Sequence, residues 1–132
     1  ADENEAVLMP ELSAEDSRFL ERVRRYIVEN IGNSDANIND MAAFAATSHS
    51  NLNRKLRSLV GITAAQLLID ARMQKARQIL ESNGNREKTN IADVAYRCGY
   101  SDPRYFSRCF KQKYHVSPSE FASEAKKPVL DN

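Results

Sequence analysis

Apolar residues recur at helical spacing along most of this chain, and no segment shows the alternation that is typical of a β-strand. Ser13, with Asp16 three places on, is an expected helix cap, and apolar residues at positions 19, 20, 23, 27 and 31 predict a helix that ends at Gly32. Residues 63–81 contain no Gly or Pro and predict a long helix with apolar surface on two sides. The pattern therefore predicts an all-α fold.

The same pattern occurs twice, over residues 38–67 and again over residues 91–121. The offset between equivalent residues is 53 before a turn and 54 after it, and one added residue in a loop is a change that a repeated unit tolerates. Each unit is a short apolar helix, a tight turn and a second helix that carries basic residues. This is the pattern of a helix-turn-helix, and two in tandem predict a protein that binds DNA.

In the first unit, Asn39 is the expected cap of the short helix, and Thr47 makes the turn. Ser48 is the expected cap of the second helix, and Gly61 ends it in a left-handed conformation. In the second unit, either Thr89 or Asn90 is expected to cap the short helix. The second helix is expected to begin at position 102, an Asp followed by a Pro, and a final short helix spans about 117–125.

These elements predict five segments along the chain. They are an acidic linker at 1–12, a first lobe at about 13–62, a connecting helix at 63–81, a second lobe at about 89–125 and a flexible tail at 126–132, with a loop at 82–88 between the connecting helix and the second lobe.

The formal net charge of +1 hides an asymmetry. The first 21 residues hold seven acids and one arginine, so the remaining 111 residues carry a net charge of +7. No Asp or Glu lies between Asp40 and Asp70, or between Asp102 and Glu120, and the second helix of each unit lies in one of these stretches. An acid there would repel phosphate, so its absence at equivalent points of a repeat favours a polyanion partner over an ordinary solvated basic face.

The side chains opposite the apolar stripe of each second helix are the expected DNA contacts, because such a helix enters the major groove. Its Arg side chains match guanine and its Asn matches adenine, although the same residues would also suit a merely solubilising surface. The outward residues are His49, Ser50, Asn53, Arg54 and Arg57 in the first unit and Arg104, Ser107, Arg108 and Lys111 in the second. Arg57 and Lys111 lie a turn later and suit phosphate, as do the short-helix starts at Asn39 and at Thr89 and Asn90. His49 is likewise expected to contact phosphate or to flank the bases that are read.

Residues 91–121 have the run IADVAYRCGYSDPRYFSRCFKQKYHVSPSEF, which resembles the signature of the AraC/XylS family of bacterial transcription regulators. The resemblance extends over about 36–122 and includes the first unit and the connecting helix. It implies seven helices, with two helix-turn-helix lobes joined by a long helix whose recognition helices enter successive major grooves. By this resemblance the base-reading residues are Ser50, Asn53, Arg54, Arg104, Ser107 and Arg108.

The helix from Ser13 and both motifs further resemble the output domain of hybrid two-component regulators of gut Bacteroidetes. Those proteins fuse a sensor, a histidine kinase and a receiver to such a domain, so the resemblance implies regulation of transcription within a larger signalling protein. The implied partners are double-stranded DNA, the fused sensor and receiver domains, a second copy on direct-repeat sites and, as a candidate, RNA polymerase. The chain begins without Met and has neither a signal peptide nor a membrane span, which predicts a cytoplasmic fragment of a protein that itself could be anchored in the inner membrane.

The chain departs from the family pattern in two places. His115 occupies the position of Gly61, where the family has Gly, so a strained left-handed His is expected. Ala122 and Ser123 follow Phe121 where the family commonly has an Arg, so a phosphate contact or ion pair from that Arg is expected to be missing.

Two other classes of function compete with DNA binding. The sequence has no Walker loop, no His-x-x-x-His and no Gly-x-Ser-x-Gly, and it predicts no enzymatic activity, metal site or cofactor. Cys98 and Cys109 lack metal-ligand spacing and are expected to be reduced thiols in the core. The stronger competitor is a helical protein-interaction module within a larger regulator.

Overall fold

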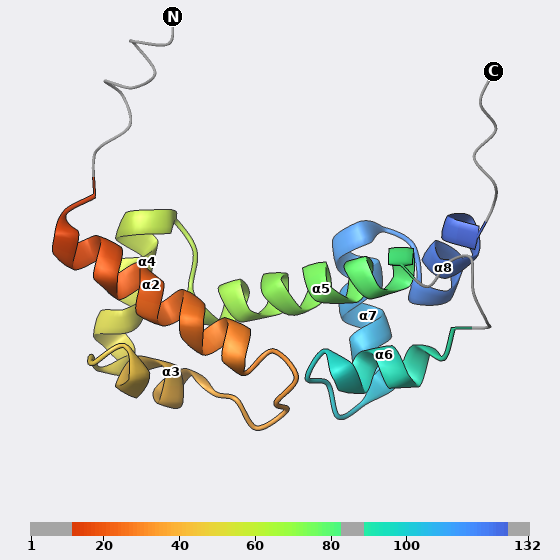
Figure 1. The fold of residues 1–132 in the computed structure, drawn as a ribbon, viewed down its shortest axis with the longest axis horizontal. Helices are drawn as coiled ribbons and strands as arrows, with labels where there is room; N and C mark the ends of the chain where they lie inside the picture. Colours follow the sequence, from red (N-terminus) through yellow and green to blue (C-terminus); the bar gives the residue numbers. More distant parts are fainter. Residues whose placement is uncertain (1–11, 83–88, 127–132) are drawn as a thin grey trace, which may run out of the picture.

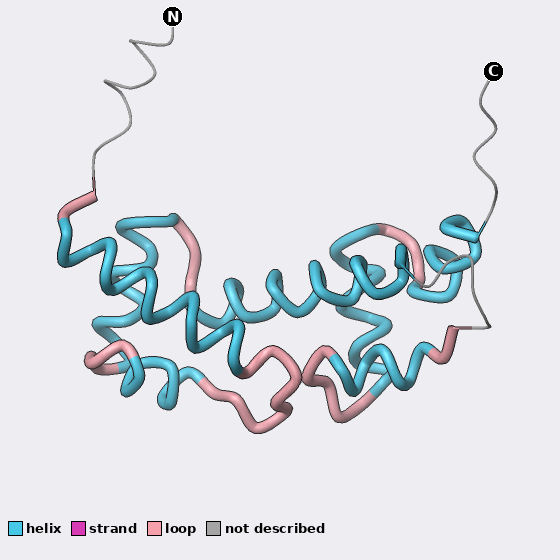
Figure 2. The backbone as a smooth tube through the Cα atoms, viewed as in Figure 1, coloured by secondary structure: helices cyan, strands magenta, loops and turns pink. Residues whose placement is uncertain are grey.

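The computed structural model describes residues 12–82 and 89–126. Within these ranges the chain forms seven helices and no strand, which confirms the predicted all-α class (Figures 1 and 2). The helices are α2 (Ala14–Glu29), α3 (Ile38–Phe44), α4 (His49–Val60), α5 (Ala64–Ser82), α6 (Ile91–Arg97), α7 (Pro103–Tyr114) and α8 (Pro118–Lys126). Most of the predicted acidic linker, the loop after α5 and nearly all of the tail lie outside the described residues.

Most helices begin where side-chain capping predicts. The Ser13 hydroxyl accepts a hydrogen bond from the backbone N–H of Asp16 at 3.0 Å, and Ser48 caps α4 in the same way. Asn90 caps α6, and Asp102 caps α7 ahead of a proline at the first helical turn. These side chains satisfy backbone donors that have no partner inside the helix.

The predicted cap at Asn39 is wrong, because Asn37 caps α3. The Asn37 Oδ1 accepts from the backbone N–H of Asp40 at 2.8 Å, and its Nδ2 donates to the Asp40 carboxylate at 3.0 Å. This reciprocal pair resembles a capping box and needs the acid three residues after the cap. Asn39 therefore lies inside the first turn of α3.

The predicted C-terminal cap of α2 at Gly32 is wrong. The helix ends at Glu29, and Asn30 is its C-terminal cap, with the Asn30 N–H donating to carbonyls of the last turn. Gly32 lies in the following loop, where a Cβ would come within 3.1 Å of the carbonyl oxygen of Arg97. The role of this glycine is thus to allow a close approach between the two lobes, and not to end a helix.

Two separate cores are built on one helix. The first core joins α2, α3 and α4 to the N-terminal half of α5, which contributes Ala64 and Leu68. The second joins α6, α7 and α8 to the C-terminal half of α5, which contributes Met73, Ala76 and Leu80. Figure 1 shows the lobes at the two ends of α5. In the described residues no helix is long and apolar enough to cross a membrane.

Candidate nucleic-acid interface

The second helix of each unit, α4 and α7, buries one face and exposes the other. Leu52 and Leu56 of α4 and Phe106 and Phe110 of α7 are fully buried, so each stripe anchors its helix to a core. In Figure 1 both helices run from the lower edge of the molecule to the upper edge, at opposite ends of α5. The repeat therefore places two similar helices at the two ends of α5, each with an outward polar face.

On α4 the outward residues Ser50, Arg54 and Arg57 are exposed, as the spacing predicted. Arg54 Nη2 donates to the Asn51 side-chain oxygen at 2.7 Å, which holds the guanidinium along the helix. Sequence reasoning missed Asn51, although its position three residues before Arg54 places both on one face. On the outward face of α4, the Asn51 amide therefore orients the Arg54 guanidinium.

The structure brings two of the predicted phosphate contacts together at the start of α4. His49 and Asn39 are both exposed, and the His49 Nδ1 lies 3.1 Å from the Asn39 Oδ1. One residue comes from α3 and the other from α4, so the pair joins the two helices of the unit. The two polar side chains therefore form one continuous polar surface rather than two separate ones.

Asn53 is the outward residue whose surroundings differ most from expectation. It is half-buried, and its Oδ1 accepts a hydrogen bond from the backbone N–H of Ala64 at 2.9 Å. Reading adenine takes both the oxygen and the nitrogen of an Asn amide, and one lone pair of this oxygen already accepts from the first turn of α5. A DNA contact by Asn53 remains a prediction, and the bond to Ala64 restricts how the amide can turn toward a base.

On α7, Arg104 and Arg108 are exposed and Ser107 is half-buried. The Arg108 guanidinium carbon lies 5.7 Å from the centre of the Tyr105 ring, which is 47% exposed. A hydrogen bond with Cys109 raises the pKa of the Tyr105 hydroxyl. Sequence reasoning also missed Tyr105, although an aromatic residue three places before an arginine shares its helix face.

The remaining predicted phosphate contacts have different surroundings. Lys111 is exposed on the last turn of α7, while its backbone oxygen accepts from the N–H of His115 at 2.7 Å. Asn90 is exposed and uses its side-chain oxygen to cap α6. The Thr89 hydroxyl is buried and has no partner among the described residues, so it does not face outward.

The charge around both recognition helices is positive. Neither α4 nor α7 contains an acid, and the cap Asp102 stands just outside α7. Asp70 of α5 lies 3.2 Å from the Lys113 ammonium and also accepts from the Gln66 amide. Its charge is offset there, so it does not oppose the arginines of the two outward faces.

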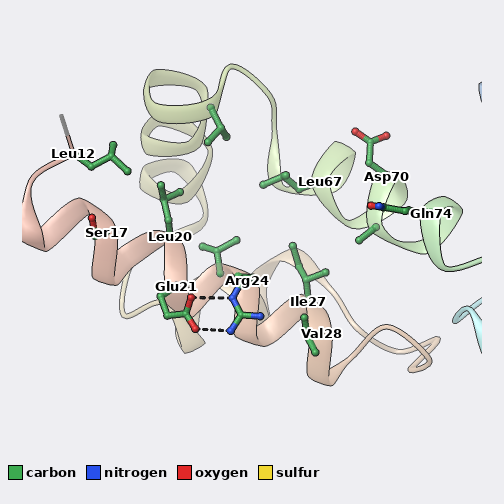
Figure 3. A pocket seen from close by; sticks show the side chains of 13 residues that line it. Leu12, Ser17, Leu20, Glu21, Arg24, Ile27, Val28, Leu67, Asp70 and Gln74 are labelled. Carbon is green, nitrogen blue, oxygen red and sulfur yellow. Dashed lines mark hydrogen bonds and ion pairs between the residues drawn. The ribbon is translucent and has the colours of Figure 1, made fainter. Parts of the chain in front are cut away.

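A groove lies apart from these helix faces, between α2 and α5 (Figure 3). It encloses about 590 Å³, and apolar side chains such as Leu20, Ile27, Val28 and Leu67 line it. Glu21 and Arg24 form an ion pair at its edge. None of the predicted DNA contacts lines this groove.

Two helix-turn-helix units that share one connecting helix define a class of DNA-binding domain. A family model described as a helix-turn-helix domain matches residues 41–124, so the chain belongs to this family, in its AraC type. The resemblance seen in the sequence is thereby confirmed, and the chain is a DNA-binding domain of the kind found in transcription regulators.

The relatives agree with this assignment. The chain is 26% identical over 83% of its length to histidine kinase P4 of Formosa agariphila. It resembles the C-terminal domain of AraT, a response regulator from Geobacillus stearothermophilus, with TM-score 0.76 and 29% identity over 93% of this chain and 95% of that one. It also resembles the DNA-binding domain of the transcriptional factor AdpA in complex with a target DNA, with TM-score 0.70 and 25% identity over 81% of this chain and 91% of that one. The chain spans 8% of the length of the histidine kinase and 40% of a further curated relative.

Proposed function

We propose that this domain binds an asymmetric double-stranded DNA site by placing α4 and α7 in successive major grooves. The observation that carries the proposal is the repetition of one surface: an acid-free helix with an exposed arginine, at Arg54 and again at Arg108. A single such helix suits any solvated surface, whereas two copies at the ends of one connecting helix suit the repeat of the duplex.

The two outward faces are unlike, which makes the proposed site asymmetric. Ser50 and Arg54 are the base-reading residues on α4, and Arg104 and Arg108 are those on α7, with Ser107 at its half-buried edge. Arginine pairs best with guanine, so the α7 segment of the site is expected to be richer in guanine than the α4 segment. His49, Arg57 and Lys111 hold phosphate beside these segments.

We further propose that the domain is the output end of a longer two-component signalling protein. The supporting observations are the likeness to a histidine kinase and to the C-terminal domain of a response regulator. In that setting a fused receiver or sensor controls the domain, which acts on the chromosome in the cytoplasm. Two copies would occupy direct repeats of the asymmetric site, and RNA polymerase is the further partner through which transcription would change.

Selection of bound duplexes from a random pool, followed by footprinting, tests the DNA-binding proposal. We expect one asymmetric site of about 15–20 base pairs per domain, which is two major grooves at one turn per groove. Affinity should fall steeply as salt rises, because phosphate contacts release counterions. A protein-interaction module would show neither sequence preference nor salt dependence, and a palindromic site within one footprint would contradict the asymmetric assignment.

A further inference from the structure

The backbones of the two lobes come close together at two glycines, Gly32 in the loop after α2 and Gly99 in the turn after α6. A Cβ on Gly99 would lie 2.5 Å from the carbonyl oxygen of Ile31, and one on Gly32 would lie 3.1 Å from the carbonyl oxygen of Arg97. The loop after α2 and the turn after α6 therefore meet face to face. Figures 1 and 2 show these two loops side by side at the centre of the molecule.

Arg72 of α5 fills this meeting point. Its Nη2 donates to the carbonyl oxygen of Asn33 in the first lobe at 2.8 Å, and its guanidinium carbon lies 5.7 Å from the ring centre of Tyr100 in the second. Its Nε would be 2.8 Å from a Cβ on Gly99, so the glycine makes room for the guanidinium. One side chain from the connecting helix thus contacts both lobes. We call Arg72, Gly32, Asn33, Gly99 and Tyr100 the interlobe junction.

Burying the Arg72 guanidinium in the junction removes water from a charged group, which costs free energy and suggests that the residue has a role besides packing. The Arg72 Nε is buried and has no hydrogen-bond partner in the described part of the chain. Burial lowers the pKa of the Arg72 guanidinium, in accord with the loss of water around it. An apolar side chain of similar length would fill this space without an unpaired donor, so the arginine is not explained by packing alone.

We propose that Arg72 is a positioning residue that sets the distance along DNA between the segments bound by α4 and α7. It lies outside both recognition helices, so it acts through the placement of the lobes. Two DNA-binding units on a rigid connection gain affinity from each other only when both fit at once, and they lose that gain when the spacing is wrong. A loosened junction therefore weakens binding to the best site. It also reduces, by a similar factor, the preference for that site over sites whose two segments are spaced differently. This inference rests on the proposed two-groove binding.

The test compares binding to the best selected site with binding to the same site carrying one base pair inserted between its two segments. The ratio of the two dissociation constants is the spacing penalty. We expect a penalty of about a hundredfold for the wild-type chain and about tenfold for Arg72→Ala, which also binds the best site about tenfold more weakly. Arg77→Ala is the matched control, because it removes the same charge from the same helix at a residue outside the junction, and it should keep the wild-type penalty.

The unfolding midpoint of each variant shows whether its spacing penalty can be compared with that of the wild type. Arg72→Ala is the deciding variant if its midpoint matches that of the wild type. Otherwise the deciding variant is Gly32→Ala, which adds one methyl group against the Arg97 carbonyl without changing the charge. A wild-type spacing penalty in the deciding variant overturns the positioning role of the junction. A wild-type chain that prefers no DNA sequence at all contradicts the proposed function instead, so the two failures are distinguishable.

Discussion

The two lobes need the same backbone geometry at two points but use different residues to achieve it. Among the described residues, four have positive φ: Ala46 and Gly61 in the first lobe, and Gly99 and His115 in the second. Ala46 and Gly99 occupy equivalent turns, and Gly61 and His115 end equivalent helices. Each lobe therefore has one glycine and one strained residue, at opposite positions.

The difference shows what a glycine is needed for in this fold. A Cβ on Gly61 would have no neighbour within 4 Å, whereas Gly99 faces the backbone of the other lobe and the Arg72 side chain. A left-handed residue with a Cβ costs about 1 kcal/mol, which this fold tolerates at Ala46 and His115. A Cβ at Gly99 would add a clash with the Ile31 carbonyl oxygen in the loop after α2 and with the Arg72 guanidinium of the connecting helix. Packing between lobes thus demands glycine more strongly than the dihedral angle does.

The largest expected effect comes from exchanging the two glycines for alanine. Gly99→Ala should lower the free energy of unfolding by about 2–4 kcal/mol, from left-handed strain plus overpacking. Gly61→Ala is the control and should cost about 1 kcal/mol, from the strain alone. Urea denaturation followed by circular dichroism measures both. Equal losses for the two variants would break the distinction between the lobes.

A second contrast lies at the equivalent positions Asn53 and Ser107. Asn53 caps α5 through the N–H of Ala64, but the residue equivalent to Ala64 in the second lobe is Pro118, which has no N–H to donate. Asn53→Ala should therefore cost about 1 kcal/mol of stability, as the loss of a helix cap does. Ser107→Ala should cost no more than about 0.5 kcal/mol, as surface changes do. Thermal and chemical unfolding of the two variants would show the asymmetry, and a larger loss in Ser107→Ala would refute it.

The smallest effects should come from relieving strain. His115 has φ 67° and Ala46 has φ 62°, and both side chains are exposed. His115→Gly and Ala46→Gly should each stabilise the domain by up to about 1 kcal/mol, less the entropy that an unfolded glycine gains. DNA affinity of His115→Gly should stay unchanged, since the residue lies beyond the outward face of α7. A clear drop in stability on chemical denaturation would show that His115 makes a contact worth more than its strain.

Local chemistry made most of the fold predictable from sequence. The helix starts at Ser48 and Asp102 follow from residues that are close in the chain, whereas the left-handed end at His115 follows from its alignment with Gly61 in the first unit. The error at Asn39 arises because two asparagines stand two residues apart, and only Asn37 has an acid three residues later with which to pair.

The other differences from prediction depend on contacts between distant residues. Helical periodicity places Asn53 on the outward face, but it carries no information on the hydrogen bond to Ala64 eleven residues later. The local pattern predicts a helix end at Gly32, whereas the neighbour that requires this glycine is Arg97 in the other lobe.

Selection of bound sites by the wild type, Arg54→Ala and Arg108→Ala, in parallel, tests the central claim most directly. Each variant should bind the wild-type site more weakly by about 1–3 kcal/mol, the value of a good arginine-to-base contact. Arg54→Ala should relax preference at one or two base pairs in one segment, and Arg108→Ala in the other, about one helical turn away. Relaxation of the same segment by both variants, or wild-type affinity and preference in both, would contradict a domain that contacts DNA with two recognition helices.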